Sequence, residues 1–210
     1  LDRVTRLNPK SHIASELRSV ARELARNHIN GRQEQAIRAI DQDNGLRLEQ
    51  LDEQIRQNPK SEELFIKRAE IRATTKRYAD AVADLGEAIA INPKRLENYW
   101  ERARINYFFR DKSQAFNDLA RAIAIEPENP KNYWTRVRYY RYESDGHGVI
   151  SDDSKLIEFV TSNNGDSSQL IGLHMDRAAA FGWQGKCDAA VADIDRAITL
   201  DGTDAKAHDF

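Results

Sequence analysis

A segment that returns every 34 residues constrains the fold of this chain more than any other feature. Asn58-Pro59-Lys60 recurs as Asn92-Pro93-Lys94, and Pro127 follows Pro93 by another 34 residues; one later period is seven residues longer. A unit of this length cannot bury its apolar face alone, so successive units are expected to stack. Aligned periods share columns of apolar or small residues: Phe65, Tyr99, Tyr133 and His174; Ala69, Ala103, Val137 and Ala178; Ala81, Ala115 and Ala190; Leu85, Leu119 and Ile194; Ala88, Ala122 and Ala197.

Each period is predicted to contain two helices. In the first, Phe65, Ala69 and Ala73 fall at four-residue steps, as on one face of a helix. The second helix is predicted from about Ala79 to Ile91, with its apolar residues on one stripe. It ends at Asn92-Pro93, because proline lacks an N–H and disfavours helix for the residue before it. The pattern therefore predicts an all-α solenoid of stacked antiparallel helix pairs.

The column pattern resembles the tetratricopeptide repeat family. An aromatic residue, a small residue four positions on, then alanine, an aliphatic residue, alanine and proline recur at period 34. The resemblance implies a right-handed superhelix, with an array in residues 61–210. Its repeats are predicted at 62–95, 96–129 and 171–204, with a divergent one at 130–170. The divergent repeat keeps its first helix, Lys131 to Glu143, but lacks the alanine and proline columns.

Residues 1–60 are predicted to form an N-terminal helical segment with partial, degenerate repeats. Leu1 to Pro9 aligns with Ile194 to Gly202, so the chain is predicted to begin inside an array and to be a fragment of a longer protein. One amphipathic helix is predicted through residues 13–24, ended by Asn30-Gly31, and a second is predicted to stop at Asn44-Gly45. Residues 46–60 resemble the second helix of a repeat.

The composition argues against several classes of function. Lys plus Arg (32) nearly balances Asp plus Glu (34), which disfavours nucleic acid as the main partner. The single cysteine, Cys187, excludes an internal disulfide and a cysteine-rich zinc site. No apolar run approaches the roughly 18 residues that span a bilayer, so no membrane insertion is expected. No targeting segment is visible; the compartment stays open, with the cytoplasm favoured because the chain lacks disulfides.

A second set of columns pairs charges. Arg68, Arg102, Arg136 and Arg177 occupy one column, and Asp84, Asp118 and Asp193 follow three of them by sixteen residues. We predict a structural ion pair between the two helices of each such repeat; the alternative is that these arginines contact a ligand. In the divergent repeat Asp152 is taken only as the nearest aspartate, and Arg136 is predicted to be free.

The family resemblance implies that the first helices line a concave inner surface. All three tryptophans fall on the columns that face inward in the family, and aromatic and arginine side chains dominate binding hot spots. We predict a groove for a partner peptide, possibly one with an acidic or carboxylate group. The alternative is that Trp100 and Trp134 pack against the neighbouring repeat, with the arginines paired to Glu70 and Glu101. The predicted peptide-binding residues are Trp100, Arg104, Tyr107, Trp134, Arg138, Arg141 and Tyr142.

No catalytic, metal-binding or cofactor-binding motif is recognised, so the chain is not expected to be an enzyme. Asp145 to Asp153, with His147, is interpreted as a loop joining helices rather than a metal site. The carboxylate-clamp columns of chaperone-binding family members hold Ile66, Glu70 and Glu101, which disfavours a chaperone tail as ligand. The predicted function is a protein–protein interaction scaffold or adaptor. The alternatives are homo-oligomerisation, for example a homodimer through Leu1 to Leu7, or the regulatory part of a longer enzyme.

Overall fold

The computed structural model describes residues 12–207 of the 210-residue chain. The chain divides into two compact units, one ending at Pro59 and the other beginning at Lys60. The segment Leu1 to Pro9, on which the predicted half-repeat and the homodimer contact depend, lies outside the described residues. Within the described residues, no helix combines the length and the apolarity needed to cross a lipid bilayer.

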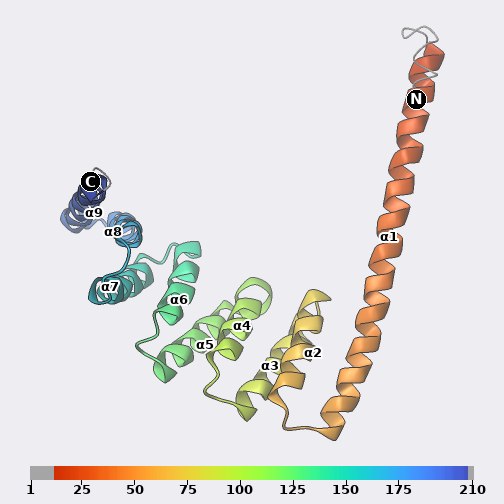
Figure 1. Ribbon diagram of the computed structural model, residues 1–210, viewed down its shortest axis with the longest axis horizontal. Helices are drawn as coiled ribbons and strands as arrows, with labels where there is room; N and C mark the ends of the chain where they lie inside the picture. Colours follow the sequence, from red (N-terminus) through yellow and green to blue (C-terminus); the bar gives the residue numbers. More distant parts are fainter. Residues whose placement is uncertain (1–11, 208–210) are drawn as a thin grey trace. The chain divides into compact units, whose positions relative to one another are not determined.

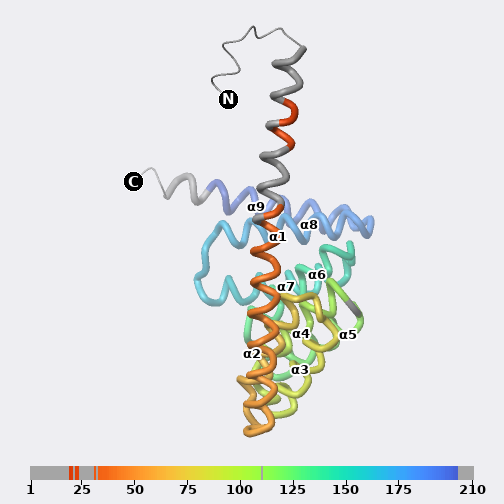
Figure 2. The backbone as a smooth tube through the Cα atoms, turned by 90° about the vertical axis from the view of Figure 1, so that its right-hand side faces the viewer, coloured from red at the N-terminus to blue at the C-terminus, as the bar shows by residue number. Residues whose placement is uncertain are grey.

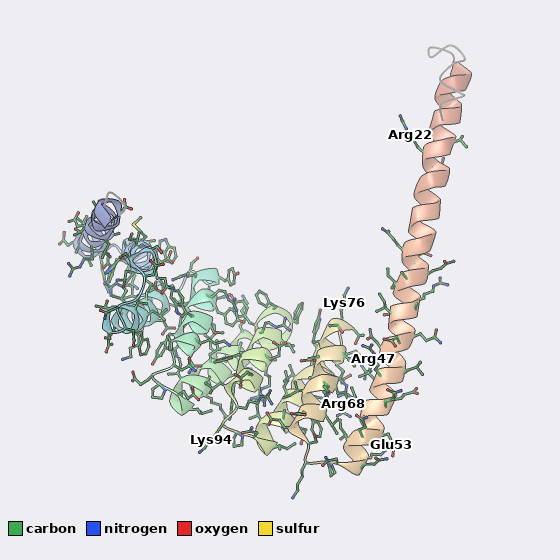
Figure 3. The ribbon with its side chains drawn as sticks, in the orientation of Figure 1. Arg22, Arg47, Glu53, Arg68, Lys76 and Lys94 are labelled. Atoms are coloured by element: carbon green, nitrogen blue, oxygen red, sulfur yellow. The ribbon has the colours of Figure 1, made fainter. Side chains whose placement is uncertain are left out.

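In the residues that the structure describes, the first unit is one helix, α1 (His12–Gln57) (Figure 1). The predicted breaks at Asn30-Gly31 and Asn44-Gly45 are wrong, because α1 runs through both. A glycine inside a helix costs only about 1 kcal/mol relative to alanine, which weakens a long helix without ending it. Exposed ion pairs along its surface, such as Arg47 with Asp43 at 3.0 Å, support the helix locally (Figure 3). The helix ends just before Asn58-Pro59, as predicted.

The second unit is a row of helix pairs. Consecutive helices lie side by side in antiparallel pairs, as α8 and α9 do in both views (Figures 1 and 2). The predicted all-α solenoid is therefore confirmed. Its elements are α2 (Glu62–Thr74), α3 (Tyr78–Ile91), α4 (Leu96–Ile105), the π turn η1 (Asn106–Arg110), α5 (Lys112–Ile125), α6 (Pro130–Tyr142), α7 (Gly146–Ser162), α8 (Ser167–Trp183) and α9 (Cys187–Ala207).

The repeat columns form the core. Ala81 and Ala115 are fully buried, and Leu85 and Leu119 beside them are at most 1% exposed. Burial of a leucine side chain contributes about 1.5–3 kcal/mol, so a column repeated along the array supplies much of its stability. The small residues allow the helix backbones to approach closely, and the leucines fill the space between successive pairs.

The third repeat forms its second helix without the alanine column. Val149 replaces the alanine there and is fully buried. Gly148 beside it makes room for the Tyr140 ring, because a Cβ at Gly148 would lie 2.3 Å from that ring. The predicted loop from Asp145 to Asp153 is wrong: Asp145 caps α7 by accepting hydrogen bonds from the backbone N–H of His147 and Gly148, both at 3.1 Å. The glycine-rich stretch is therefore the first turn of a helix.

The first helices end with a shared hydrogen-bond pattern. An amide N–H reaches back five residues from Arg77, Asp111, Asp145 and Lys186. In three repeats this bond belongs to a Schellman motif, with a positive φ at Lys76 (62°), Ser144 (53°) and Gly185 (69°). Lys76 lies at this end of α2 (Figure 3). In the second repeat the same bond closes η1 instead, and Phe108 and Phe109 of η1 are about half exposed.

Candidate functional site

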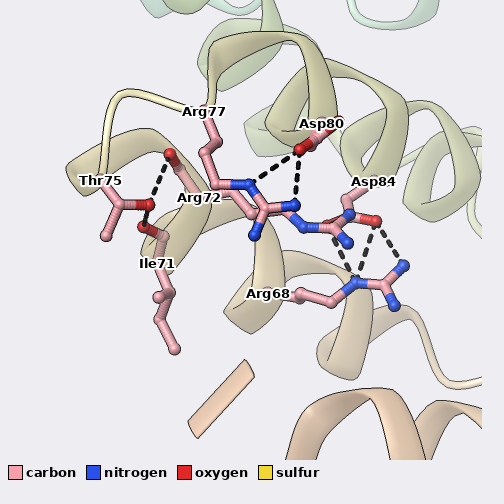
Figure 4. Close-up of polar contacts among 7 residues, drawn as sticks. All are labelled: Arg68, Ile71, Arg72, Thr75, Arg77, Asp80 and Asp84. Carbon is pink, nitrogen blue, oxygen red and sulfur yellow. Dashed lines mark hydrogen bonds and ion pairs between the residues drawn. The ribbon is translucent and has the colours of Figure 1, made fainter. Parts of the chain in front are cut away.

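The arginine column forms an ion pair between the two helices of every repeat. Arg68 reaches Asp84 at 2.6 Å, with Arg72 on the second oxygen (Figure 4). Arg102 binds Asp118 through two bonds of 2.6 and 2.9 Å. Arg177 binds Asp193 at 2.7 Å, as predicted. The aspartates are at most 5% exposed, so this arginine column stabilises the fold and its fork geometry is already occupied.

The prediction that Arg136 is free is wrong. Its guanidinium donates to both oxygens of Asp152, at 2.6 and 2.9 Å, and Asp152 follows it by sixteen residues as in the other repeats. The extra residues of this repeat come later. They lengthen α7 to 17 residues, against 14 in α3, and α8 to 17 residues, against 13 in α2. The register between the two helices of the repeat is therefore unchanged.

A groove of about 590 Å³ opens between the first helices of three successive repeats. Its lining comes almost entirely from α2, α4 and α6, the helices that the family resemblance places on the inner surface. The floor is apolar and the rims carry charges of both signs. The lining residues are Ile66, Ala69, Glu70, Leu85, Arg95, Glu97, Asn98, Trp100, Glu101, Arg104, Ile105, Lys131, Thr135, Arg138 and Tyr139.

The charges of the groove differ between its walls. On α4, Arg104 pairs with Glu101 on the preceding turn, at 3.0 Å from Nε, so that wall is close to neutral. On α6, the Lys131 ammonium lies 4.0 Å from the centre of the Trp100 ring, and the Arg138 guanidinium lies 5.4 Å from the Tyr139 ring. Among the described residues neither cation has a carboxylate within ion-pair distance. The α6 wall therefore carries two positive charges without counter-charges.

Trp100 has a structural contact as well as a place in the groove. Its indole N–H donates to the Asn132 side-chain oxygen at 2.9 Å, and Asn132 in turn donates to the carbonyls of Ala122 and Glu126. The ring also packs on two core clusters. The alternative in which the tryptophans pack against the neighbouring repeat therefore holds for part of the surface of Trp100. The pairing of Arg104 with Glu101, which belongs to the same alternative, is also found. Trp134, which is 38% exposed, and Arg138 do not follow this alternative.

The seven predicted peptide-binding residues do not all lie in one site. Trp100, Arg104 and Arg138 line the groove. Tyr107 is buried, stacks on the Tyr139 ring at 4.1 Å and donates to Glu143 at 2.6 Å. It lies in the π turn η1, and its ring packs in a core cluster with Leu119 and Tyr139 although its column faces inward in the family. Arg141 binds two aspartates, and Trp134 and Tyr142 are exposed on α6 outside the lining of this groove.

Two lining residues were not identified from the sequence. Lys131 occupies a column that holds Glu63 and Glu97 in the two preceding repeats, and this reversal of charge is a signal that an alignment of the repeats contains. Tyr139 occupies a column with Ile71 and Ile105, which suggests packing alone. Neither residue falls on the inward-facing columns taken from the family.

Exposed aromatic residues follow one edge of the first helices. Phe108, Tyr142 and Trp183 occupy equivalent positions of successive repeats and are 53%, 62% and 56% exposed. The rings of Phe108 and Tyr142 meet at 6.3 Å. We name these three residues the aromatic edge. Single exposed apolar residues are common, but three at one repeat position form an ordered apolar surface.

Histidine, cysteine, aspartate and glutamate are the side chains that could bind a metal ion or transfer a proton in the part of the chain that the structure describes. No group of three or more histidine, cysteine, aspartate or glutamate side chains there is arranged to hold a metal ion. His174 contacts Asp193 at 2.8 Å inside the core, beside Arg177. Burial alone would raise the pKa of Asp193, but the hydrogen bonds from Arg177 and His174 lower it. This aspartate is therefore a charged structural group.

Comparisons with known proteins show the fold. No protein-family model matches the chain, and no curated protein matches it in sequence. A crystal structure of MamA superposes with a TM-score of 0.57 at 19% identity, covering 76% of this chain and 89% of that one. MamA from Desulfovibrio magneticus RS-1 gives 0.54 at 14% identity, with 76% and 86% covered. A tetratricopeptide repeat protein from Parabacteroides merdae ATCC 43184 gives 0.50 at 14% identity, with 93% and 69% covered. The chain therefore has a tetratricopeptide-type fold.

Proposed function

We propose that this chain is an interaction scaffold or adaptor that holds a peptide of a partner protein in the groove between α2, α4 and α6. The observation that carries the proposal is the groove itself, lined by first helices from three successive repeats. Its size falls in the range of sites that bind ligands, about 300–1,000 Å³. A groove assembled from several repeats suits an extended or helical segment better than a compact small molecule.

The composition of the lining supports a peptide with an acidic group. Apolar side chains such as Ile66 and Ile105 offer area to bury, while Lys131 and Arg138 carry charges without a counter-charge. A carboxylate placed on this wall would gain attraction to both cations. The groove residues come from rigid packed helices, so little conformational entropy is lost when a ligand binds.

The aromatic edge extends the proposed surface beyond the groove. Aromatic side chains bury a large area and lose little side-chain entropy, which is why they dominate many protein interfaces. A partner segment that leaves the groove toward the ends of the first helices would meet Phe108 and Tyr142. The exposure of this row, repeat after repeat, is in keeping with a surface that a partner covers.

The proposal is tested with the full 210-residue chain as target for a displayed library of random peptides. Peptides that bind are synthesised, and their dissociation constants are measured by fluorescence anisotropy. A groove variant combines Glu70→Lys with Arg138→Glu, two exposed rim residues on different helices. We expect binding of the selected peptides to weaken at least about ten-fold, because the charge pattern of the rim is inverted.

The control variant combines Glu87→Lys with Arg121→Glu, which are exposed on the second helices α3 and α5. Both double variants keep the net charge of the parent chain, so non-specific electrostatic effects match. The control is expected to bind like the parent. The proposal fails if no peptide binds the parent chain, or if the control weakens binding as much as the groove variant does. If the groove variant alone loses binding, capture from lysate with the same three baits would identify the natural partner.

A further inference from the structure

Two walls of the groove carry opposite charges that do not meet. On α2, Glu70 is exposed in the lining, and no cation of the described residues lies within ion-pair distance of it. On α6, Lys131 and Arg138 are exposed in the same lining, without a counter-charge in that part of the chain. The groove therefore separates an accessible carboxylate from two accessible cations.

The wall between them, on α4, is close to neutral. Arg104 donates to Glu101 from Nε at 3.0 Å, and Glu97 lies 3.9 Å from Arg95 at the start of the helix. Trp100 of the same helix is partly buried and offers the groove an aromatic surface. Across the three helices the charge of the lining therefore changes from negative on α2, through neutral on α4, to positive on α6.

A smaller hollow of about 290 Å³ adjoins the groove at Glu70. Its lining includes Tyr78 and Phe109, whose rings stack at 3.9 Å, and the Phe109 side chain is half exposed. Arg104 also lines the hollow, but its charge is paired with Glu101. A carboxylate and an aromatic ring both attract cations, so the hollow suits the side chain of a lysine or an arginine.

We propose that the groove recognises its partner segment by two opposite charges in a fixed order. A lysine or arginine of the segment lies in the hollow beside Glu70, and an aspartate or glutamate lies against Lys131 and Arg138. Apolar residues between them cover Ile66 and Trp100. A segment lying in the opposite direction would place like charges together, so the order of the charges sets the direction of binding. This inference rests on the proposed function, since it names the charge pattern that the same groove selects.

The distance between the two walls sets the spacing of the charges in the partner. Packed helices lie about 8–10 Å apart, and α4 stands between α2 and α6, so the outer two helices are about 20 Å apart. An extended chain advances about 3.3–3.6 Å per residue. The basic and the acidic residue of an extended segment are therefore expected to be roughly four to six positions apart.

The test measures which residue of a peptide each wall recognises. Peptides selected on the parent chain are resynthesised with each arginine replaced by citrulline, each lysine by norleucine and each acidic residue by its amide. Affinities at low ionic strength are measured on the parent, on Glu70→Gln, and on Lys131→Gln combined with Arg138→Gln. On the parent, neutralising the basic or the acidic residue is expected to weaken binding about three-fold or more, as for partly exposed ion pairs.

Each variant is expected to remove one of these two effects and to keep the other. On Glu70→Gln, neutralising the basic residue should change affinity less than about 1.5-fold, because its partner is already gone. On the double variant the same holds for the acidic residue. Exchanging the two charged residues within one peptide is expected to weaken its binding to the parent about ten-fold, because both walls then face like charges.

The matched controls are Glu87→Gln and the combination of Lys94→Gln with Arg121→Gln, all exposed residues outside the groove. They change the net charge as the groove variants do and are expected to keep both effects. Thermal unfolding of every variant should match the parent, since each change replaces an exposed side chain.

The proposed charge order is overturned if peptides bind the parent but the effect of the basic residue persists on Glu70→Gln, or that of the acidic residue on the double variant. It is also overturned if the exchanged peptide binds as tightly as the original, or if the controls lose the same effects. Failure to obtain any binding peptide would overturn the proposed function, and this inference with it.

Discussion

The second and third repeats fill the same core position with different kinds of side chain. In the second repeat, Leu119 fills the core column and is fully buried. In the third, the same column holds Asp153, which is also fully buried and which Arg141 contacts at 2.8 Å. Arg141 in turn occupies the position of Tyr107 in the second repeat and of Ala73 in the first. An ion pair has therefore replaced an apolar contact at an equivalent place in the solenoid.

In the third repeat the charged core residue is accompanied by a charged residue in the facing column. Arg141 also binds Asp176 on α8 at 2.9 Å, so one guanidinium serves two carboxylates. One carboxylate oxygen of Asp153 and the Nε of Arg141 are buried and have no hydrogen-bond partner among the described residues. A buried ion pair with unsatisfied atoms contributes little net stability, because desolvation offsets most of the attraction. The third repeat is therefore expected to be less well stabilised than the second.

The largest expected effect on stability is that of Leu119→Asp, which places the residue of the third repeat at the equivalent position of the second. Without an arginine opposite it, the carboxylate would be buried alone beside Tyr107 and Ala115. We expect a loss of at least about 4 kcal/mol in the free energy of unfolding at pH 8. Urea denaturation followed by circular dichroism measures it. Adding Tyr107→Arg should restore part of the loss; no restoration would show that the pair depends on more than these two positions.

The reverse exchange is expected to stabilise the chain. Asp153→Leu with Arg141→Ala copies the Leu85 and Ala73 combination of the first repeat. Replacing a buried ion pair by apolar residues commonly stabilises a protein by about 1–4 kcal/mol. Hydrogen exchange of α6, α7 and α8 would detect slower local opening even where the array does not unfold as one unit. A destabilised double variant would mean that the ion pair stabilises this repeat more than an apolar contact can.

A smaller effect is predicted for the dependence of stability on pH. Burial raises the pKa of Asp153 to about 7, Asp176 and Asp152 act in the same direction, and Arg141 opposes them. Of these neighbours Asp152 is neutralised by Arg136 on α6, and Arg177 of α8 reaches Ser154 beside the site at 2.9 Å. Because the folded state binds this proton more tightly than the unfolded chain, stability falls as pH rises from about 4 to about 7.

The expected change is about 2.5 kcal/mol between pH 5 and pH 8, measured as the difference between the parent and Asp153→Asn. Other groups titrate in both proteins and cancel in that difference. Asp193 has a lowered pKa, so its contribution is lost only as pH falls below the usual range of a carboxylate, outside this window. Parallel pH profiles for the two proteins would show that Asp153 does not titrate here.

The repeat period allowed the helix pairs and much of the core to be predicted. Ala81, Leu85 and Asp84 are buried where the columns place them, since a stripe at helical spacing must face its partner helix. The errors came from local signals. Glycine and asparagine at Asn30-Gly31 were interpreted as a stop, and Asp145 with its glycines as a loop, although a glycine is tolerated in a long helix and an aspartate can cap one.

The groove was predictable as a surface but only partly as a set of residues. Three of the seven predicted binding residues line it, and Tyr139 and Lys131 were missed. Tyr107 shows why: its column faces inward in the family, yet its ring is buried against Tyr139. Contacts with the next repeat decide which side chain reaches the surface, and the spacing of one repeat does not reveal them.

By itself, the sequence determined the period, the two helices of the three regular repeats and three of the four arginine–aspartate pairs. These depend on helix geometry and on which residues recur at fixed spacing. Only the tertiary structure decided that Asp153 shares Arg141 with Asp176, and that Tyr139 is fully buried in the lining of the groove. Such contacts join side chains from different helices of different repeats. Their distances are set by how the pairs stack, and no periodicity within one helix contains that information.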